Sequence, residues 1–371
     1  MTSRTTFFAT LAILAATLAF LSRVPTAEAA EETSGSVYVM TNQPTGNRVI
    51  QYHRASNGSL KQNSIVSTGG LGGTGNGVGA LDPLGSQNSL VLSGDGARLL
   101  AVNAGSNELS VLAAGSSGLR LLSRVPSGGD FPNSVAVRGN LVYVLNAHGS
   151  PNVTGFRLAA NGVLHQLPGS TRALPGGTSA APHDIVFSPD GARLLVSEGG
   201  TNQIDIFAIG SNGRITGIVT QPSPGGPFGL RFGRHEVLVV AEATTAAIST
   251  YQLTSDDTLN VVSASVPNGQ MATCWLSITL SGETFTSNTA SGNLSSYQVS
   301  ADGNATLSNA IAANIAPGAP VDSALTSEED FLYVEDSARG IVFVFRVKDH
   351  GLARIGSVTG LPTTLQGIAA Q

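Results

Sequence analysis

The chain has 371 residues, of which 45 are glycine and 17 are proline, while only 12% are charged and 5% are aromatic. Its formal net charge is −5 and it has no basic stripe, which excludes a typical nucleic-acid-binding protein. Abundant glycine without a Gly-X-Y period, together with many Val, Leu, Ser and Thr residues, favours short strands joined by tight turns.

The first 30 residues have the pattern of a secretory signal peptide. Arg4 supplies a positive charge, residues 7–21 are apolar, and Ala27-Glu28-Ala29 resembles a cleavage site. The apolar run is shorter than the ~20 residues that normally span a bilayer. We therefore expect residues 1–30 to be removed, and residues 31–371 to form a secreted, extracellular protein with no membrane span.

Cys274 is the only cysteine, so no disulfide can form within the chain. A secreted protein of this kind must then gain its stability from a large core or a closed architecture. Four N-x-S/T sequons begin at Asn57, Asn152, Asn293 and Asn304. They are candidate glycosylation sites if the host is eukaryotic.

A hairpin recurs seven times after the signal peptide. Its second strand is an apolar run that ends in Asn, Asp or Glu, and the end residues are roughly 40–60 residues apart, close to the period of a four-stranded propeller blade. They are Asn42, Asn103, Asn146, Glu198, Glu242, Asn288 and Asp336. Third and fourth strands follow in each copy, with a period of two within the strands.

The first copy lacks its innermost strand, because the folded chain begins near Val37, already in a second strand. The C-terminal segment 361–371 (LPTTLQGIAAQ) resembles the first-strand segments FPNSVAV and APHDIVF. We predict that it completes the first blade and closes the ring, which removes exposed sheet edges. The predicted fold is therefore all-β, a single seven-bladed β-propeller of four-stranded blades.

The repeats SLVLSGDGARLLAVN and DIVFSPDGARLLVSE resemble the lactonase-like seven-bladed propeller family. That family includes 6-phosphogluconolactonase-type enzymes and fungal carboxymuconate-cyclising enzymes. The resemblance implies a hydrolase or a lactonising enzyme that acts on a small-molecule lactone or carboxylate ligand. The alternative is a non-catalytic extracellular propeller, such as an adhesin, an antigen or a protein that binds carbohydrate or peptide.

Candidate site residues lie where first strands begin and second strands end, because these positions share one edge of an antiparallel hairpin. His183 begins a first strand opposite Glu198, and a histidine–carboxylate pair is suited to acid/base catalysis. Glutamate is a poorer turn former than Asn or Asp, so we expect Glu198 and Glu242 to face a ligand. The alternative is that His183 belongs to a structural hydrogen-bond network. Candidate substrate-binding residues at this edge are Asn103, Asn133, Asn146, Asp336 and Trp275; His148, Asp184 and Asp322 rank below them.

The lactonase-like family typically has Pro-Arg-His where this chain has Ala181-Pro182-His183. The missing arginine argues against a phosphorylated or carboxylated lactone, because arginine binds such anions through two parallel hydrogen bonds. Arg231 lies in another first strand, and by alternation we expect it to point away from the His183 position. The glycine-rich loop 69–86 is predicted to overhang the same mouth as a lid.

No cofactor is predicted. If the second-strand ends converge, their oxygen ligands suit Ca²⁺ or Mg²⁺. We expect a monomer.

Overall fold

The computed structural model describes residues 1–2, 33–75, 81–349 and 351–371. The predicted signal peptide lies almost entirely outside these residues, so its removal stays a prediction. Within the described ranges the helical segments are three-residue turns, namely η2 (Ala104–Ser106), η3 (Gly177–Ser179) and η4 (Arg234–Glu236). None of them is long enough to cross a bilayer.

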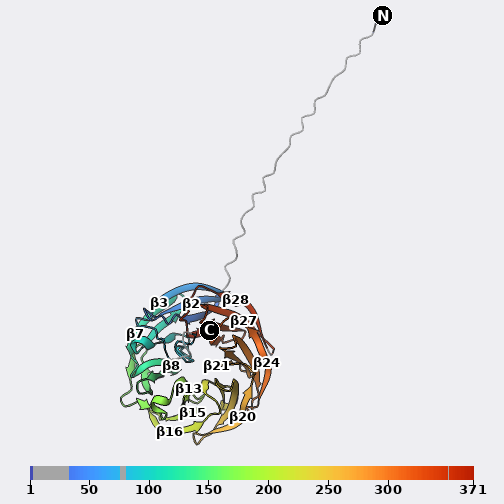
Figure 1. Ribbon diagram of the computed structural model, residues 1–371. Coiled ribbons are helices and arrows are strands. Elements are labelled where there is room, and N and C mark those ends of the chain that lie inside the picture. The colour runs from blue at the N-terminus through green and yellow to red at the C-terminus, as the bar shows by residue number, and fades with distance from the viewer. Residues whose placement is uncertain (3–32, 76–80, 350) are drawn as a thin grey trace. The chain divides into compact units, whose positions relative to one another are not determined.

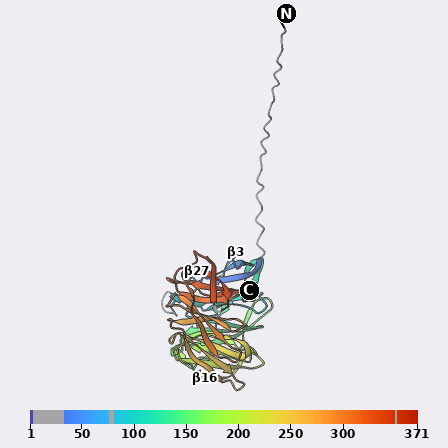
Figure 2. The same cartoon turned by 90° about the vertical axis from the view of Figure 1, so that its right-hand side faces the viewer.

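The described strands form seven antiparallel sheets. Figure 1 shows these sheets arranged around one axis, with the chain passing from blade to blade in sequence order, and Figure 2 shows the same ring from the side. Blades 2 to 7 each add strands outward in sequence order. The predicted seven-bladed propeller is therefore confirmed.

The strand bounds are as follows. Blade 1 contains β29 (Ile368–Ala370), β1 (Thr33–Met40), β2 (Arg48–Ala55) and β3 (Leu60–Ser67). Blade 2 contains β4 (Leu90–Leu92), β5 (Arg98–Asn103), β6 (Glu108–Gly115) and β7 (Gly118–Pro126). Blade 3 contains β8 (Asp130–Arg138), β9 (Leu141–His148), β10 (Asn152–Leu158), β11 (Leu164–Gln166) and β12 (Arg172–Ala173). Blade 4 contains β13 (Pro182–Phe187), β14 (Arg193–Glu198), β15 (Gln203–Ile209) and β16 (Ile215–Pro222). Blade 5 contains β17 (Pro227–Phe232), β18 (Val237–Glu242), β19 (Ala247–Leu253) and β20 (Leu259–Pro267). Blade 6 contains β21 (Thr273–Ile278), β22 (Glu283–Asn288), β23 (Asn293–Val299) and β24 (Ala305–Asn314). Blade 7 contains β25 (Pro320–Leu325), β26 (Phe331–Asp336), β27 (Ile341–Lys348) and β28 (Gly351–Val358).

The C-terminal strand closes the ring as predicted. β29 pairs antiparallel with β1, with Val37 opposite Ala370 and Val39 opposite Ile368. In Figure 1 the C-terminus lies on the inner side of the ring, near β2 and β27. The two ends of the folded chain therefore share one sheet, and β1 is paired on both sides, with β29 on its inner side and β2 on its outer side.

The second strands are buried on both faces because each sheet packs against a neighbouring blade on either side. Residues 194–198 of β14 are all buried, and so are residues 99–103 of β5. The fourth strands are more exposed, as in β3, whose residues are exposed or half-buried along their whole length. This gradient explains why the apolar runs of the second strands carry the clearest repeat in the sequence.

The Ser-x-Asp-Gly segments form the turns between first and second strands. In blade 4 the Ser188 hydroxyl donates to Asp190 Oδ1 over 2.6 Å, and Gly191 has a φ of 75°. Ser93, Asp95 and Gly96 form the same turn in blade 2, where the φ of Gly96 is 69°. Glycine is favoured at both places because the left-handed backbone is costly for residues with a Cβ atom.

Blade 3 departs from the predicted four strands. Its outer strand is divided into β11 and β12, both of which pair with β10. Pro168 and Gly169 separate the two pieces. Proline cannot donate a ladder hydrogen bond, so it interrupts an otherwise continuous strand.

The four sequons differ in accessibility. Asn57 and Asn304 are exposed at turns, whereas Asn152 and Asn293 are buried. The amide of Asn152 donates to Ser150 O over 2.9 Å, and that of Asn293 donates to Gln270 Oε1 over 2.6 Å. Only Asn57 and Asn304 therefore present a side chain that a glycan can occupy without disturbing the fold. Cys274 is a buried free thiol.

Candidate active site in the central channel

First-strand starts and second-strand ends do share one edge of each blade, but the pairing there is irregular. In blade 4, Pro182 pairs with Glu198 and Asp184 with Ser197, so His183 is an extra residue in a β-bulge. Similar shifts in register occur at the start of the first strands of blades 3, 5, 6 and 7. A bulge changes the direction of the side chain that it contains. Within the described residues no direct hydrogen bond or ion pair joins His183 to Glu198, so their action as an acid/base pair stays a prediction.

The Glu198 carboxylate is fully buried and bound by groups of its own blade and of the loop that leads into it. Its oxygens accept hydrogen bonds from the Gly176 amide over 3.1 Å and from the Thr201 hydroxyl over 2.6 Å. Asp205, on β15, is a second buried acid in this blade. Burial raises the pKa of Asp205 well above its usual range, and the adjacent Glu198 carboxyl raises it further. The pair is therefore a structural element in which Asp205 carries the proton.

Glu242 has an equivalent environment in blade 5. Its oxygens accept hydrogen bonds from Thr245 and Ser265, both over 2.7 Å, and from Ser249. Thr245 is three residues beyond Glu242, just as Thr201 is three residues beyond Glu198. Both glutamates thus stabilise the end of a second strand, and neither exposes surface to a ligand. Their catalytic role stays a prediction that these contacts do not favour.

The predicted substrate-binding residues are also buried, and their contacts are structural. Asn103 Oδ1 accepts from Asn47 and Thr68, Asn133 donates to Pro182 O, and Asn146 donates to Asn152 Oδ1. Asp336 accepts from Ala319 N and from Arg339, and Trp275 Nε1 donates to Ser86 O over 2.8 Å. In this conformation none of Asn103, Asn133, Asn146, Asp336 and Trp275 has measurable exposure. A substrate contact by any of them therefore stays a prediction.

His183 remains partly exposed and has a defined orientation. Its Nδ1 lies 2.6 Å from the carbonyl oxygen of Gly85, and its ring stacks on Phe228 with the ring centroids 4.2 Å apart. Because a carbonyl oxygen only accepts, Nδ1 must carry the proton and Nε2 the lone pair. Burial lowers the pKa of His183 to about 4, so the imidazole is neutral at physiological pH. No described residue hydrogen-bonds to Nε2.

Gly199 determines the space beside this ring. A Cβ atom at Gly199 would lie 2.4 Å from His183 Nε2, a distance at which one of the two groups must move. Phe228 packs in turn against Trp275, with centroids 4.7 Å apart. The histidine is therefore held between an aromatic cluster and a glycine.

The predicted lid is partly a plug. Residues 81–88, at the end of the glycine-rich loop, bind several first strands. Gln87 N donates to His183 O over 3.1 Å, Ser86 Oγ donates to Asn133 O over 2.7 Å, and Gln87 Nε2 donates to Leu276 O over 2.7 Å. Leu84, Ser86 and Gln87 have no exposed surface. This plug connects blades 3, 4 and 6 and covers the channel at the end where His183 lies.

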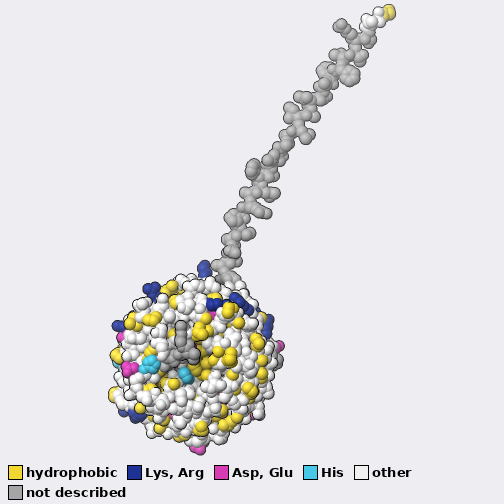
Figure 3. Space-filling model, in the orientation of Figure 1, with side chains coloured by type: hydrophobic (Ala, Val, Ile, Leu, Met, Phe, Trp, Pro, Cys, Tyr) yellow, Lys and Arg dark blue, Asp and Glu magenta, His cyan; other side chains and the backbone are white. Residues whose placement is uncertain are grey.

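Charged side chains are scarce around the centre of one face. On the face drawn in Figure 3, histidine and hydrophobic side chains lie near the centre, whereas most lysine and arginine side chains lie toward the edge.

A polar network around Arg231 lies in the channel. Arg231 Nη2 donates to Asn88 Oδ1 over 2.9 Å, and its Nη1 lies 3.4 Å from Asp184 Oδ2. The sequence singled out Asp184 but did not place Arg231 beside it.

Two acidic side chains in and beside this network have raised pKa values. Burial raises the pKa of Asp184 to about 6, although Arg231 opposes this shift. Burial raises the pKa of Asp322 to about 7, again against the effect of Arg231. Asp184 also accepts hydrogen bonds from Asn88, Leu230 N and Ile185 N, which stabilise its ionised form.

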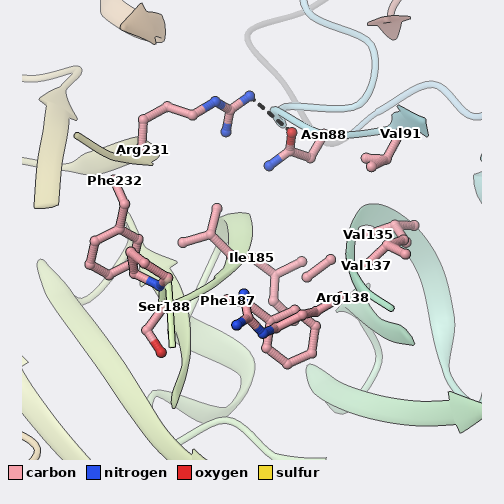
Figure 4. A pocket seen from close by; sticks show the side chains of 13 residues that line it. Asn88, Val91, Val135, Val137, Arg138, Ile185, Phe187, Ser188, Arg231 and Phe232 are labelled. Atoms are coloured by element: carbon pink, nitrogen blue, oxygen red, sulfur yellow. Dashed lines mark hydrogen bonds between the residues drawn. The ribbon is translucent and has the colours of Figure 1, made fainter. Parts of the chain in front are cut away.

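The open part of the channel is lined by the innermost strands on both sides of Arg231. One cavity of ≈ 320 Å³ lies between β4, β8, β13 and β17, and another of ≈ 300 Å³ lies between β4, β17, β21, β25 and β29. Both include Asn88, Val91 and Arg231 in their walls. Figure 4 shows the first cavity, with Arg231 and Asn88 joined by a hydrogen bond and with valine, isoleucine and phenylalanine side chains around it.

A separate pocket of ≈ 470 Å³ is lined by Gly72, Gly73, Asp130, Phe131 and His148, among others. The His148 ring stacks on Phe131 with the centroids 4.2 Å apart. Burial lowers the pKa of His148, and Asp130 opposes this effect. Sequence reasoning placed His148 near the same edge and ranked it low, and the structure places it at the end of β9.

The comparisons agree with the architecture. The sequence profile of the family described as "Lactonase, 7-bladed beta-propeller" matches residues 29–179. Over these residues the chain is similar to that family. A Bacteroides fragilis protein proposed to be a 6-phosphogluconolactonase has a TM-score of 0.70 at 16% identity, and the match covers 92% of this chain and 99% of that chain.

Two further solved structures show how broadly the fold is used. The Pseudomonas aeruginosa periplasmic gluconolactonase PpgL has a TM-score of 0.70 at 17% identity, with 90% of this chain and 98% of PpgL covered. The Staphylococcus aureus virginiamycin B lyase has a TM-score of 0.54 at 14% identity, and the match covers 72% of this chain and 82% of the lyase. No curated protein matches the sequence. At these identities the structural matches show the fold, and the activity must be argued from the site.

Acidic, histidine and cysteine side chains do not cluster in the described part of this propeller. No three His, Cys, Asp or Glu side chains there are grouped so that they could hold an ion. Glu198, Glu242 and Asp336 each take their hydrogen bonds within their own blades. These contacts do not favour the Ca²⁺ or Mg²⁺ site considered from the sequence, and it stays a prediction.

Proposed function

We propose that this protein is secreted and that it hydrolyses a small, uncharged lactone at the plugged end of the channel, with His183 as the general base. The observation that carries the proposal is the state of the imidazole. Its Nδ1–H is held by the Gly85 carbonyl and its Nε2 has no partner among the described residues. This is the tautomer and orientation that a base needs in order to take a proton from water.

The reaction follows from this tautomer. Nε2 takes a proton from a water molecule as the water oxygen attacks the lactone carbonyl carbon. The resulting imidazolium returns that proton to the ring oxygen when the carbon–oxygen bond of the ring breaks, which gives a hydroxy acid and regenerates neutral His183. The reverse sequence forms a lactone from a hydroxy acid, so a lactonising direction uses the same residue.

Among the described residues no lysine or arginine is bound to His183, which supports an uncharged substrate. The residue before His183 is Pro182, and Arg231 is engaged with Asn88 and Asp184 inside the channel. A phosphate or carboxylate on the substrate would therefore lack the paired hydrogen bonds that arginine provides. An unsubstituted or alkyl-substituted lactone needs no such partner.

The test is turnover of a panel of γ- and δ-lactones, measured by base consumption in weakly buffered solution. We expect His183→Gln to lower kcat/KM at least 100-fold, the usual contribution of general base catalysis being ~10²–10⁴. His165→Gln is the matched control, because His165 is exposed on β11. The proposal fails if no lactone is turned over, or if both variants retain the wild-type rate.

One observation favours the alternative of a non-catalytic binding propeller. The pocket beside Phe131 and His148 combines a stacked aromatic face with the exposed polar side chains of Asn107 and Asp130. Aromatic stacking next to amide and carboxylate groups is suited to a carbohydrate. Glycan binding that is lost in Asp130→Ala, together with no lactone turnover, would decide for this function.

A further inference from the structure

The channel cavities form a funnel whose walls carry many apolar side chains beside polar ones such as Arg138 and Ser277. The walls of the first cavity include Val91, Val135, Val137, Phe187 and Phe232, which are half-buried or buried side chains from four different blades. The second cavity adds Ile278, Leu325 and Ile368. In Figure 4 the labelled apolar side chains surround the space below Arg231 and Asn88. Such walls favour a hydrocarbon chain, since apolar surface removed from water stabilises a complex in proportion to its area.

Arg231 supplies hydrogen-bond donors to this space. A guanidinium has five N–H groups. Three of them account for the bonds to Asn88 Oδ1, Leu230 O and Asp184 Oδ2, so two remain without a partner among the described residues. The side chain is 25% exposed, whereas Asp184 is fully buried. A ligand in the funnel can therefore reach donors of Arg231.

The charge around Arg231 is already balanced. Asp184 lies 3.4 Å from its guanidinium, and Asp322 is near enough for Arg231 to lower its pKa. An anionic ligand at this position would be repelled by the two acids, and a cationic ligand would be repelled by Arg231. A neutral carbonyl oxygen needs only hydrogen-bond donors, which Arg231 has.

We propose that the funnel is a binding site for a neutral carbonyl compound with an alkyl chain, whose oxygen accepts hydrogen bonds from Arg231 and whose chain packs between the valine and phenylalanine side chains. This site is separate from His183. The His183 side chain contacts Gly85 of the plug and Phe228, and it is not among the residues that line either cavity. The inference is thus independent of lactone turnover.

Alkyl ketones are suitable probes because they cannot be hydrolysed. Calorimetric titration with 2-octanone and 2-decanone at pH 7.5 should give saturable binding. Each added methylene that is buried should raise the affinity about fourfold, so 2-decanone, which has two more methylenes, should bind roughly 15-fold more tightly than 2-octanone. Octane-1-sulfonate and octylammonium have chains of similar length with opposite charges, and each should bind at least tenfold more weakly than the ketones.

Variants locate the site. Val137→Glu places a charge on the funnel wall and should abolish ketone binding, whereas Val261→Glu, at an exposed position of β20, should leave it unchanged. Arg231→Gln should weaken binding at least fivefold, but it removes a partner of buried Asp184, so Val137→Glu is the decisive variant if that protein does not fold. His183→Gln should bind ketone normally even where it lacks lactone turnover.

Three results would overturn the proposal. These are the absence of saturable ketone binding, tighter binding of the sulfonate or the ammonium compound than of the ketone, and equal binding by folded Val137→Glu and wild-type protein.

Discussion

Removal of residues 361–371 should destabilise the protein by an amount comparable to its whole stability. The deletion takes away Leu365 and Ile368, whose side chains are buried, and burying such a side chain contributes about 1.5–3 kcal/mol. It also removes the hydrogen bonds of β29 to β1 and those of Gln366 to Leu84 N and Ser86 O in the plug. The sum is at least about 5 kcal/mol, against a total free energy of unfolding of about 5–15 kcal/mol for a typical domain.

The assay compares three proteins by thermal unfolding and by size-exclusion chromatography. The truncated chain should aggregate or melt at least 15 °C below wild type, because it also exposes the edge of β1. Leu365→Ala should give an intermediate loss of about 2–5 kcal/mol. Removal of residues 1–30 is the control, since it deletes none of the described strands. A monomeric truncated protein that melts within 3 °C of wild type would refute this account of ring closure.

Three other changes test the site and the buried acids. Gly199→Ala should displace the His183 ring and lower lactone kcat/KM at least tenfold with little change in Tm, and an unchanged rate would show that Gly199 does not position the base. The folded-state pKa of His183 is about 4 rather than 6.5, so neutral His183 contributes up to about 3 kcal/mol to the free energy of unfolding. This contribution is fully present above pH 6.5 and is lost as the pH falls toward 4. Urea unfolding should show that the free energy of unfolding of His183→Gln depends less on pH between about 4 and 6.5 than that of the wild-type protein. Identical pH profiles for the two proteins would contradict this prediction. Asp205→Asn should raise Tm at pH 8 and have less effect near pH 4, because the raised pKa of Asp205 makes the folded wild-type protein less stable as the pH rises. A lower Tm of the variant at pH 8 would show that the Asp205 carboxyl is needed for stability.

The sequence alone determined the architecture. Second strands such as β5 and β14 are buried on both faces, so their apolar runs repeat visibly with each blade, and the segment around Ile368 could be matched to first strands by pattern alone. These signals are local and periodic, and strand formation between packed sheets follows from them. The shared edge of first-strand starts and second-strand ends followed from antiparallel pairing.

Tertiary structure decided which of the residues at that edge are accessible. The bulge at His183 shifts the register beside Glu198, and a one-residue shift in register is invisible in a pattern of polar and apolar residues. Glu198 and Glu242 are buried because hydroxyl groups three residues further on bind them, an interaction that depends on the backbone path after the strand. The plug, and the hydrogen bond of Arg231 to Asn88, join residues of different blades. Such contacts form only once the ring has closed, which is why the sequence could place these residues on one edge but could not say which of them face the channel.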